Sequence, residues 1–315
     1  MKLSQWRAAL EVSRQNLNVT ESARRLFVSQ SVISKQIRAL ETELGVKIFE
    51  RSGKRFVGTT RAGKKLLQMA GALMDNAQNI ERAAREFSGD SGSIRLAATH
   101  FELATFLPEI FQKFQNSKYS AELLLQQGAA AQIAPWVLAG EVDLGVLASP
   151  TMDEPGIIAF PFAEFPLILI AAPDFKNLHL LESNPFQIEN LIHFPLILPH
   201  ISLDIRAKIE KVFQYYDLKP KVVFDSLDID SMKTWVLNKL GIAILPENAL
   251  KNDEKQRVRI FHISNFFPKL QARILIRRGA FLRRADYAFI QLFAPHLTMN
   301  VIDSALNGDE KDHFL

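Results

Sequence analysis

Apolar positions recur at helical spacing in three short segments near the start of the chain. The first segment, residues 4–16, carries Trp6, Ala9, Leu10 and Val12 on one face, which is typical of an amphipathic helix. Thr20 is a good N-cap for a second helix, which we expect to turn three residues toward the core: Ala23, Leu26 and Phe27. Ser29 caps a third helix that ends at Gly45, with inner residues Val32, Ile33, Ile37, Leu40 and Leu44.

The polar positions of the third helix fall on its outer face, and a Gly-Lys-Arg turn with a return strand follows it. Gln can pair with adenine, Lys or Arg with guanine, and Ser with base edges or phosphate. Residues 20–63 therefore predict a winged helix-turn-helix that binds DNA, with a basic wing on the phosphates. The alternative is a structural helical hairpin with surface charge. The predicted DNA contacts are Ser29, Gln30, Ser31, Ser34, Lys35, Arg38, Arg51, Lys54 and Arg55.

A seven-residue repeat runs through the next segment. Its apolar residues alternate in steps of four and three: Leu66, Ala70, Leu73, Ala77, Ile80, Ala84 and Phe87. This spacing is typical of a coiled coil, and a dimer would fix the spacing of two DNA half-sites. The alternative is a helix lying on its own domain. Residues 88–92, Ser-Gly-Asp-Ser-Gly, indicate a hinge.

Residues 93–300 alternate between strand and helix patterns. Strands are expected at 93–99, 121–127 and 142–148, separated by helices at 103–116 and 131–140. A second cycle has strands at 165–173, 194–199, 221–225 and 242–246, with helices around 186–191, 202–217 and 231–241. A late strand at 271–279 and a helix at 285–297 close the pattern. This order predicts two α/β lobes, with a ligand site between them at the carboxyl ends of the strands.

Charge is concentrated at one end of the 315 residues. The net charge is +4, but residues 1–65 hold 14 Lys or Arg against 5 Asp or Glu, as expected when one module meets phosphates. A solvated basic surface is the simpler alternative. The chain has no cysteine, which excludes disulfides and cysteine-based zinc sites. Its N-terminus does not resemble a secretion signal, and no apolar run would span a bilayer, so we expect no membrane partner and a cytoplasmic location.

Motifs for catalysis, nucleotides or metals are absent from the sequence. It contains no G-x-S-x-G, Walker or G-x-G-x-x-G pattern, and its seven histidines lack metal-site spacing. We therefore expect no cofactor, no metal and no enzymatic activity. A rival hypothesis, a DNA-tethered α/β enzyme, would need a nucleophile–base pair or a metal in the cleft. A second rival is a ligand-blind DNA-packaging protein.

The helix-turn-helix segment, residues 20–63, resembles the N-terminal domain of LysR-type transcriptional regulators. That family has the pattern S-x-Q-I-x-x-L-E-x-x-L-G-x-x-[LI]-F-x-R, matched here by Ser34, Gln36, Ile37, Leu40, Glu41, Leu44, Gly45, Ile48, Phe49 and Arg51. Ser31 and Arg61 stand where the family usually has proline, which is helpful but not required at helix starts. Further segments, among them FAPHLT at 293–298, are similar to the CysB-like branch, which activates cysteine biosynthesis and sulfur assimilation.

The resemblance implies a multi-domain fold with a periplasmic-binding-protein-like effector domain. We expect a winged helix-turn-helix head at 1–61, and a dimerising linker helix with its hinge at 62–90. The two-lobed α/β effector domain spans 91–300. Lobe I covers 91–161 and 269–300, lobe II covers 162–268, and 301–315 form a C-terminal tail. The chain would cross between the lobes near Ala159–Phe162 and Phe267–Gln271.

In the CysB-like branch, the site between the lobes holds small anions such as sulfate or acetylated serine. The matching positions here are Thr99, His100, Phe101, Glu102, Ala129, Gln132, Ala148, Ser149, His200, Ser202, Asp204 and Arg206. Several hydroxyls of the branch are lost, and Glu102 and Asp204 add carboxylates that Arg206 offsets only if it points inward. We predict a changed ligand: one with an amine, one larger and less anionic, or none. Alternatively, Glu102 and Asp204 face solvent or cap helices.

These observations predict a LysR-type regulator of sulfur-related metabolism that acts as a homodimer or homotetramer. Its partners would be double-stranded promoter DNA and a small-molecule effector, and RNA polymerase is a candidate further partner. The effector would shift the equilibrium between two states of the protein. Regulation of an unrelated pathway, with an altered or absent ligand, is the alternative within the same family.

Overall fold

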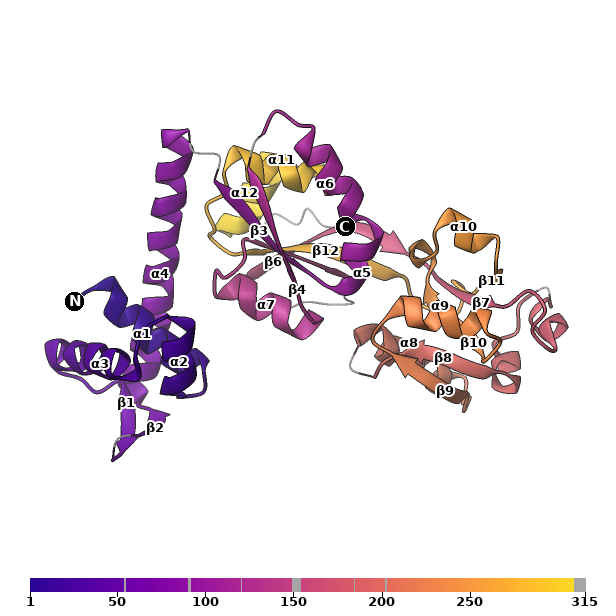
Figure 1. The fold of residues 1–315 in the computed structure, drawn as a ribbon, viewed down its shortest axis with the longest axis horizontal. Helices are drawn as coiled ribbons and strands as arrows, with labels where there is room; N and C mark the ends of the chain where they lie inside the picture. Colours follow the sequence, from indigo (N-terminus) through magenta and orange to yellow (C-terminus); the bar gives the residue numbers. More distant parts are fainter. Residues whose placement is uncertain are drawn as a thin grey trace. The chain divides into compact units, whose positions relative to one another are not determined.

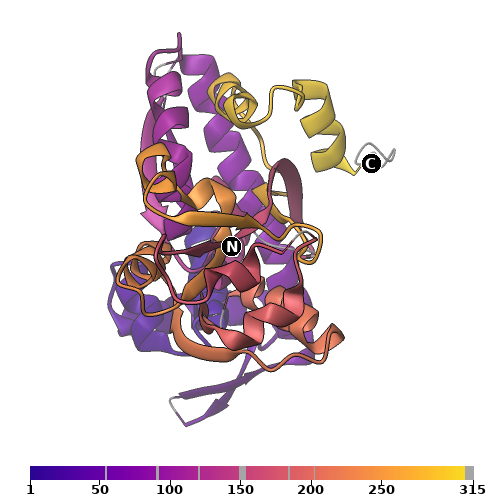
Figure 2. The ribbon, with the colours of Figure 1, turned by 90° about the vertical axis from the view of Figure 1, so that its right-hand side faces the viewer.

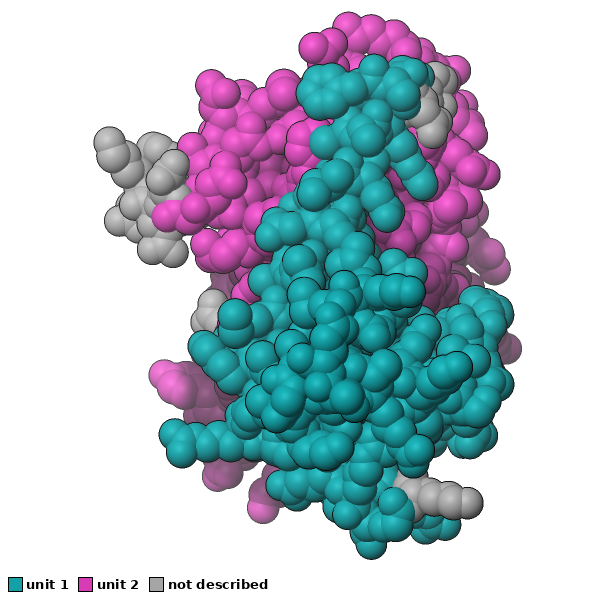
Figure 3. Space-filling model, turned by 90° about the vertical axis from the view of Figure 1, so that its left-hand side faces the viewer, with its two compact units in different colours: residues 1–89 teal, residues 90–315 magenta. Residues whose placement is uncertain are grey.

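The computed structural model describes residues 1–53, 55–89, 92–119, 121–148, 154–183, 185–201 and 203–308, with the backbone alone at 204. The chain divides into two compact units, Met1–Gly89 and Asp90–Leu315, coloured separately in Figure 3. Within the described residues, no helix is both long enough and apolar enough to cross a membrane.

The first unit is a winged helix-turn-helix followed by a long helix, as the sequence predicts. Helices α1 (Leu3–Arg14), α2 (Val19–Arg25) and α3 (Gln30–Leu44) precede the antiparallel wing strands β1 (Phe49–Ser52) and β2 (Arg55–Thr59) (Figure 1). Ser29 caps α3 through its hydroxyl, and Gly45 ends it at φ +67°. Gly53, also at positive φ, turns the wing.

Two details of the head differ from the sequence prediction. The N-cap of α2 is Asn18, whose side chain accepts the backbone N–H of Glu21, so Thr20 lies inside the helix. Phe27 and Val32, both expected in the core, are 95% and 37% exposed. Phe27 adopts φ +54° in the turn between α2 and α3, a conformation that takes the residue out of helical register. Helical spacing alone does not reveal such a turn.

The linker helix α4 (Arg61–Ser88) belongs partly to the head core. Leu67, Ala70 and Met74 are buried against the head. Farther along, Leu73, Ile80 and Phe87 are 38%, 70% and 88% exposed. The first turns of α4 therefore lie on their own domain, whereas the apolar residues of later turns are uncovered in the single chain.

The second unit contains two five-stranded sheets. The first has the order β4-β3-β5-β12-β6 (Figure 1), with β3 (Ser93–Ala98), β4 (Glu122–Gln127), β5 (Leu144–Ala148), β6 (Ile157–Phe165) and β12 (Leu270–Arg277). The second has the order β11-β7-β10-β8-β9, with β7 (Leu167–Ala171), β8 (Pro195–Pro199), β9 (Lys221–Ser226), β10 (Ile242–Pro246) and β11 (Arg259–His262). Parallel pairs in each sheet (β3 with β4 and β5, β8 with β9 and β10) fit the expected α/β lobes.

The helices cover these sheets. Lobe I carries α5 (His100–Thr105), α6 (Leu107–Gln115), α7 (Ala130–Leu138), α11 (Arg284–Phe293) and α12 (Met299–Asn307). Lobe II, which faces the viewer in Figure 2, carries α8 (Asp204–Tyr215), α9 (Ile229–Leu237), the short α10 (Asn252–Lys255) and three 3-10 turns, at Leu178–Leu181, Ile188–His193 and Glu247–Ala249. Separate apolar clusters fill the two lobes. Each lobe therefore has an apolar core of its own.

The chain passes between the lobes on two antiparallel strands. The pairing of β6 with β12 begins at Phe165 opposite Leu270, so the first sheet extends a few residues beyond the expected crossing at Ala159–Phe162. Residues 103–116, expected as one helix, form α5 and α6, with Pro108 in the first turn of α6. Residues 301–307, placed in the tail from the sequence, belong to α12, whose Ile302 and Leu306 are buried in the lobe I core.

Candidate functional site

The outer face of α3 presents a continuous polar surface. Gln30, Ser31, Lys35 and Arg38 are exposed, and Ser34 is half-buried. The hydroxyls of Ser29 and Ser31 lie 2.7 Å apart at the start of the helix. The exposed Val32 adds an apolar position beside this face, and such a side chain can contact a thymine methyl group. Val32, expected in the core from its spacing, is therefore a further candidate DNA contact.

Arg51 of the wing, a predicted DNA contact, already interacts with other residues of the head. The Arg51 guanidinium donates from Nη2 to Glu41 Oε2 at 3.2 Å, and its Cζ lies 4.4 Å from the centre of the Phe56 ring. Arg55 is exposed, whereas Lys54 lies outside the described residues. Arg51 therefore ties the wing to α3, a role that the sequence analysis did not give it.

Glu41 organises this junction from a buried position on α3. Its Oε1 accepts the backbone N–H groups of Ile48 at 2.9 Å and Phe49 at 3.2 Å. The side chain has no exposed surface, and Lys47 approaches Oε2 at 3.7 Å. The Glu of the family pattern thus fixes where the wing leaves the helix.

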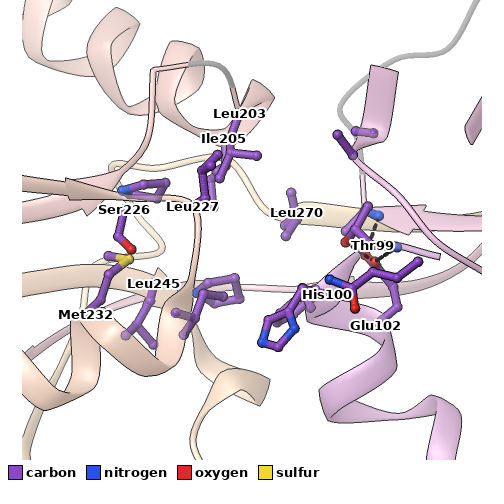
Figure 4. Close-up of a pocket in the computed structure, with 18 of the residues that line it drawn as sticks. Thr99, His100, Glu102, Leu203, Ile205, Ser226, Leu227, Met232, Leu245 and Leu270 are labelled. Carbon is purple, nitrogen blue, oxygen red and sulfur yellow. Dashed lines mark hydrogen bonds between the residues drawn. The ribbon is translucent and has the colours of Figure 1, made fainter. Parts of the chain in front are cut away.

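The second unit contains a cavity of about 420 Å³ between its two lobes. Figure 4 shows Thr99, His100 and Glu102 of lobe I on one side of this cavity, and the side chains of lobe II on the other. Six of the predicted ligand residues line it: Thr99, His100, Phe101, Glu102, Ala129 and Ala148. The lobe II side consists mainly of apolar residues that the sequence analysis did not select: Pro199, Leu203, Ile205, Leu227, Ile229, Met232, Leu245 and Pro246.

The carboxyl group of Glu102 is buried at the edge of this cavity, and only 1% of the residue is exposed. Its Oε2 accepts the backbone N–H of Thr99 at 3.1 Å and also the Thr99 hydroxyl, while Oε1 accepts the backbone N–H of Ala148 at 2.7 Å. Burial raises the pKa of Glu102 above its usual range, although the hydrogen bonds from Thr99 and Ala148 act in the opposite direction. Glu102 therefore caps α5, as the alternative interpretation of the sequence stated.

His100 and Phe101 connect the lobes beside the cavity. His100 Nε2 lies 3.3 Å from Asp228 Oδ1 at the start of α9, and Phe101 packs against a lobe II cluster. Asp228 caps α9 by accepting from the backbone N–H groups of Asp230 and Ser231. Burial acts to raise the pKa of Asp228, but the bonds from Ser231 and Asp230 and the nearby His100 together lower it.

Potential metal ligands also meet here. One ligand atom from each of His100, Asp228 and Asp230 lies within 4.8 Å of the others, a grouping that linear spacing does not reveal. Asp230 Oδ1 is 2.7 Å from Lys233 Nζ, and both oxygens of Asp228 hold protein donors. The carboxylates of Asp228 and Asp230 thus already interact with donors of the protein.

Three predicted ligand residues are absent from the cavity lining. The side-chain oxygen of Gln132 accepts the backbone N–H of Ala129 at 2.9 Å, and His200 Nε2 lies 4.0 Å from Asp225 Oδ2. Arg206, 8% exposed, donates to Glu210 at 2.9 Å and to the Pro199 carbonyl at 3.0 Å. Its charge is therefore directed at Glu210. Ser149, Ser202 and the Asp204 side chain lie outside the described residues.

Comparison with known proteins identifies both units. Residues 3–64 match the bacterial regulatory helix-turn-helix family of LysR proteins, and residues 87–298 match the LysR substrate binding domain. The chain is 30% identical to the HTH-type transcriptional regulator CysB of Burkholderia cenocepacia, with full coverage of both proteins. It is 34% identical to the regulator SsuR of the same organism, over 94% of this chain and 96% of that protein.

The solved structures agree. The cofactor-binding domain of the Cbl transcriptional regulator superposes with a TM-score of 0.63 at 25% identity, covering 68% of this chain and 93% of that domain. Full-length OxyR from Pseudomonas aeruginosa has the same fold, with a TM-score of 0.64 at 21% identity over 93% of this chain and 97% of its own. The two family matches, together with the likeness to CysB over the full length of both proteins, place the chain in the LysR family of bacterial transcriptional regulators.

Proposed function

We propose that this protein regulates genes of sulfur-related metabolism and reads their promoters with the outer face of α3. The observation that carries the proposal is the exposed row Gln30, Ser31, Lys35 and Arg38 on a helix whose opposite face is buried in the head. Such a helix presents base-reading side chains to a major groove without disturbing its own core. Likeness to CysB and SsuR over almost the whole chain supports the choice of pathway.

The exposed residues of α4 support a dimer. Leu73, Ile80 and Phe87 follow each other at intervals of seven and are uncovered in the single chain. A second α4 in register would bury them, as in a coiled coil, and would set two heads at a fixed half-site spacing. Ile80→Glu should shift the protein toward monomer in analytical ultracentrifugation. An unchanged sedimentation coefficient would place the dimer contact elsewhere.

A small molecule in the cavity between the lobes is the proposed effector. Two lobes joined by the β6 and β12 crossings can close on a ligand, and closure would alter how paired subunits are arranged. Contact with RNA polymerase is the proposed route from that change to transcription. DNA binding, dimerisation and ligand binding can be tested separately, because they depend on different residues in the head, in α4 and around the cavity.

Genome-wide mapping of bound sites, followed by gel-shift titration on the recovered sequences, tests the proposal. A regulator should prefer its own promoter over competitor DNA by roughly 10³-fold or more. Lys35→Ala or Arg38→Ala should weaken that binding, whereas Arg85→Ala in the last turn of α4 should not. Binding sites unrelated to sulfur genes would overturn the pathway, and equal affinity for competitor DNA would indicate a packaging protein.

A further inference from the structure

At three of the helices that begin at the cavity between the lobes, a side chain of the protein accepts a backbone N–H at the helix start, whereas α8, which also begins there, has no side-chain cap. Gln132 accepts the backbone N–H at the start of α7, and Asp228 accepts two at the start of α9. Glu102 does the same at α5. Uncapped helix starts offer backbone N–H groups to an anion. At α5, α7 and α9 the side chains of the protein have taken some of these donors.

Glu102 goes further than an ordinary cap, because it also reaches a neighbouring strand. Its two oxygens collect the Thr99 backbone N–H and hydroxyl and, from the end of β5, the Ala148 backbone N–H. These donors come from two separate segments and converge on one point at the cavity edge (Figure 4). A free oxyanion at this point would need the same donors.

We propose that the Glu102 carboxyl group fills the anion position of lobe I, so that the cavity takes a ligand with no anionic group and a mainly apolar body. The proposal rests on the proposed function only in treating this cavity as the effector site. It favours a larger and less anionic ligand, which is one of the three alternatives predicted from the sequence, over the small anions of the CysB-like branch. Glu102 is then a specificity-determining residue.

The charges around the cavity exclude an anion for a second reason. Among the described lining residues, none is Lys or Arg. Arg206 is held by Glu210 and the Pro199 carbonyl, and Lys233 by Asp230 and Glu254. His100 stands beside Asp228. An anion entering the cavity would thus approach the oxygens of Glu102 with no unengaged described cation to offset them.

The remaining lining fits an apolar body. Leu203, Ile205, Leu227, Met232 and Leu245 form the lobe II side (Figure 4), and Phe101 closes the lobe I side, edge-on to Phe165 at 6.2 Å between ring centres. A cavity of about 420 Å³ lies within the usual range for small-molecule sites. Gln127 is the lining residue that offers an amide for orienting a ligand.

Isosteric probes of different charge test the ligand class directly. Benzamide and benzoate share shape and size, so their affinities for the purified full-length protein, measured by calorimetry, isolate the effect of the charge. We expect benzamide to bind at least tenfold more tightly than benzoate, and sulfate to give no heat of binding. Benzoate or sulfate binding as tightly as benzamide would overturn the proposal.

Removal of the Glu102 carboxyl group tests whether the Thr99 and Ala148 donors can bind a free anion. Glu102→Ala leaves a gap that acetate can fill, so acetate should raise the melting temperature of this variant and leave that of the wild type unchanged at equal ionic strength. Glu109→Ala, which removes an exposed carboxylate paired with Lys113 on α6, is the control and should behave as wild type. If neither aromatic probe binds, the melting temperature of Glu102→Ala with and without acetate decides. A higher melting temperature with acetate supports the proposal, and an unchanged one overturns it.

If Glu102→Ala fails to fold, Glu102→Gln replaces it, because glutamine keeps the volume and one acceptor oxygen. Benzoate affinity should then rise toward that of benzamide, and an unchanged ratio would overturn the proposal. Promoter binding is measured on the same samples. Loss of sequence-specific DNA binding would refute the proposed function alone, whereas tight anion binding with intact DNA binding would refute the ligand class alone.

Discussion

Substitution of Glu41 measures what holds the wing against α3. The residue is 2% exposed, and its Oε1 accepts the backbone N–H groups of Ile48 and Phe49 while Oε2 accepts from Arg51. Glu41→Ala leaves two buried N–H groups without a partner, at about 1–3 kcal/mol each. We therefore expect the wing to lose about 3 kcal/mol of local stability, which is roughly a 100-fold change in its opening equilibrium.

Glu41→Gln separates the contribution of the backbone hydrogen bonds from that of the charged partners. An amide oxygen in the place of Oε1 can still accept from Ile48 and Phe49, so this variant should lose only the interaction with Arg51 and Lys47. Because those partners are partly exposed, the expected cost is about 1 kcal/mol or less. Glu43→Ala, an exposed position on the same helix, is the control and should cost less than about 0.5 kcal/mol.

Hydrogen exchange of the full-length protein, followed by mass spectrometry of the peptide over residues 46–60, reports on this opening. Exchange should accelerate strongly in the alanine variant, slightly in the glutamine variant and not in the control. If the alanine variant exchanged within about threefold of wild type, the wing would not depend on Glu41. The placement of Arg51 would then need another cause.

Three further predictions concern the head and the cavity. Gly63→Ala should destabilise the head by about 1–3 kcal/mol in chemical denaturation, because the added Cβ would lie 2.0 Å from the Ile48 carbonyl oxygen; Gly71→Ala, with open space around it, should be neutral or stabilising. The raised pKa of Glu102 means that its protonated form favours folding below pH about 4.5, an advantage lost as pH rises through the folded-state pKa. Relative to wild type, Glu102→Gln should therefore gain stability with rising pH in urea titrations; a constant difference would contradict this sign. Asp228→Ala should cost about 1 kcal/mol at neutral pH through the lost helix cap, and this cost should vanish as pH falls through the lowered Asp228 pKa, which urea titration of that variant checks.

Long, regular patterns made the fold predictable. The Ser29 cap and the Gly45 end of α3, and the alternation of strands and helices in the second unit, follow from local spacing and local chemistry. Phe27 was placed wrongly because a single positive φ between α2 and α3 overrides helical periodicity. Strands β6 and β11 and helices α10 and α12 were not predicted. Strand β11 is only four residues long and exists through its pairing with β7, and β6 likewise depends on its long-range pairing with β12.

The cavity was predictable in position and less so in chemistry. Lobe I residues such as Thr99 and Ala148 follow strand ends, where binding sites form in parallel sheets. The apolar lobe II residues Leu227 and Met232 come from a loop and a helix whose approach depends on the packing of the entire lobe. The meeting of His100 with Asp228 joins positions 128 apart in the sequence, and no local pattern encodes that contact.

The proposed role of Glu102 depends on its being an acid rather than an amide. The segment Thr99-His100-Phe101-Glu102 has the form Thr-x-x-Glu, which is a capping box, so the helix-capping role was visible in the sequence beside the resemblance to an anion site. A glutamine at this position would accept through one oxygen and keep two N–H donors available. A carboxylate accepts through both oxygens and donates nothing. The change from amide to acid therefore turns a group that offers hydrogen bonds to an anion into one that consumes the surrounding donors, with no change in the fold around it.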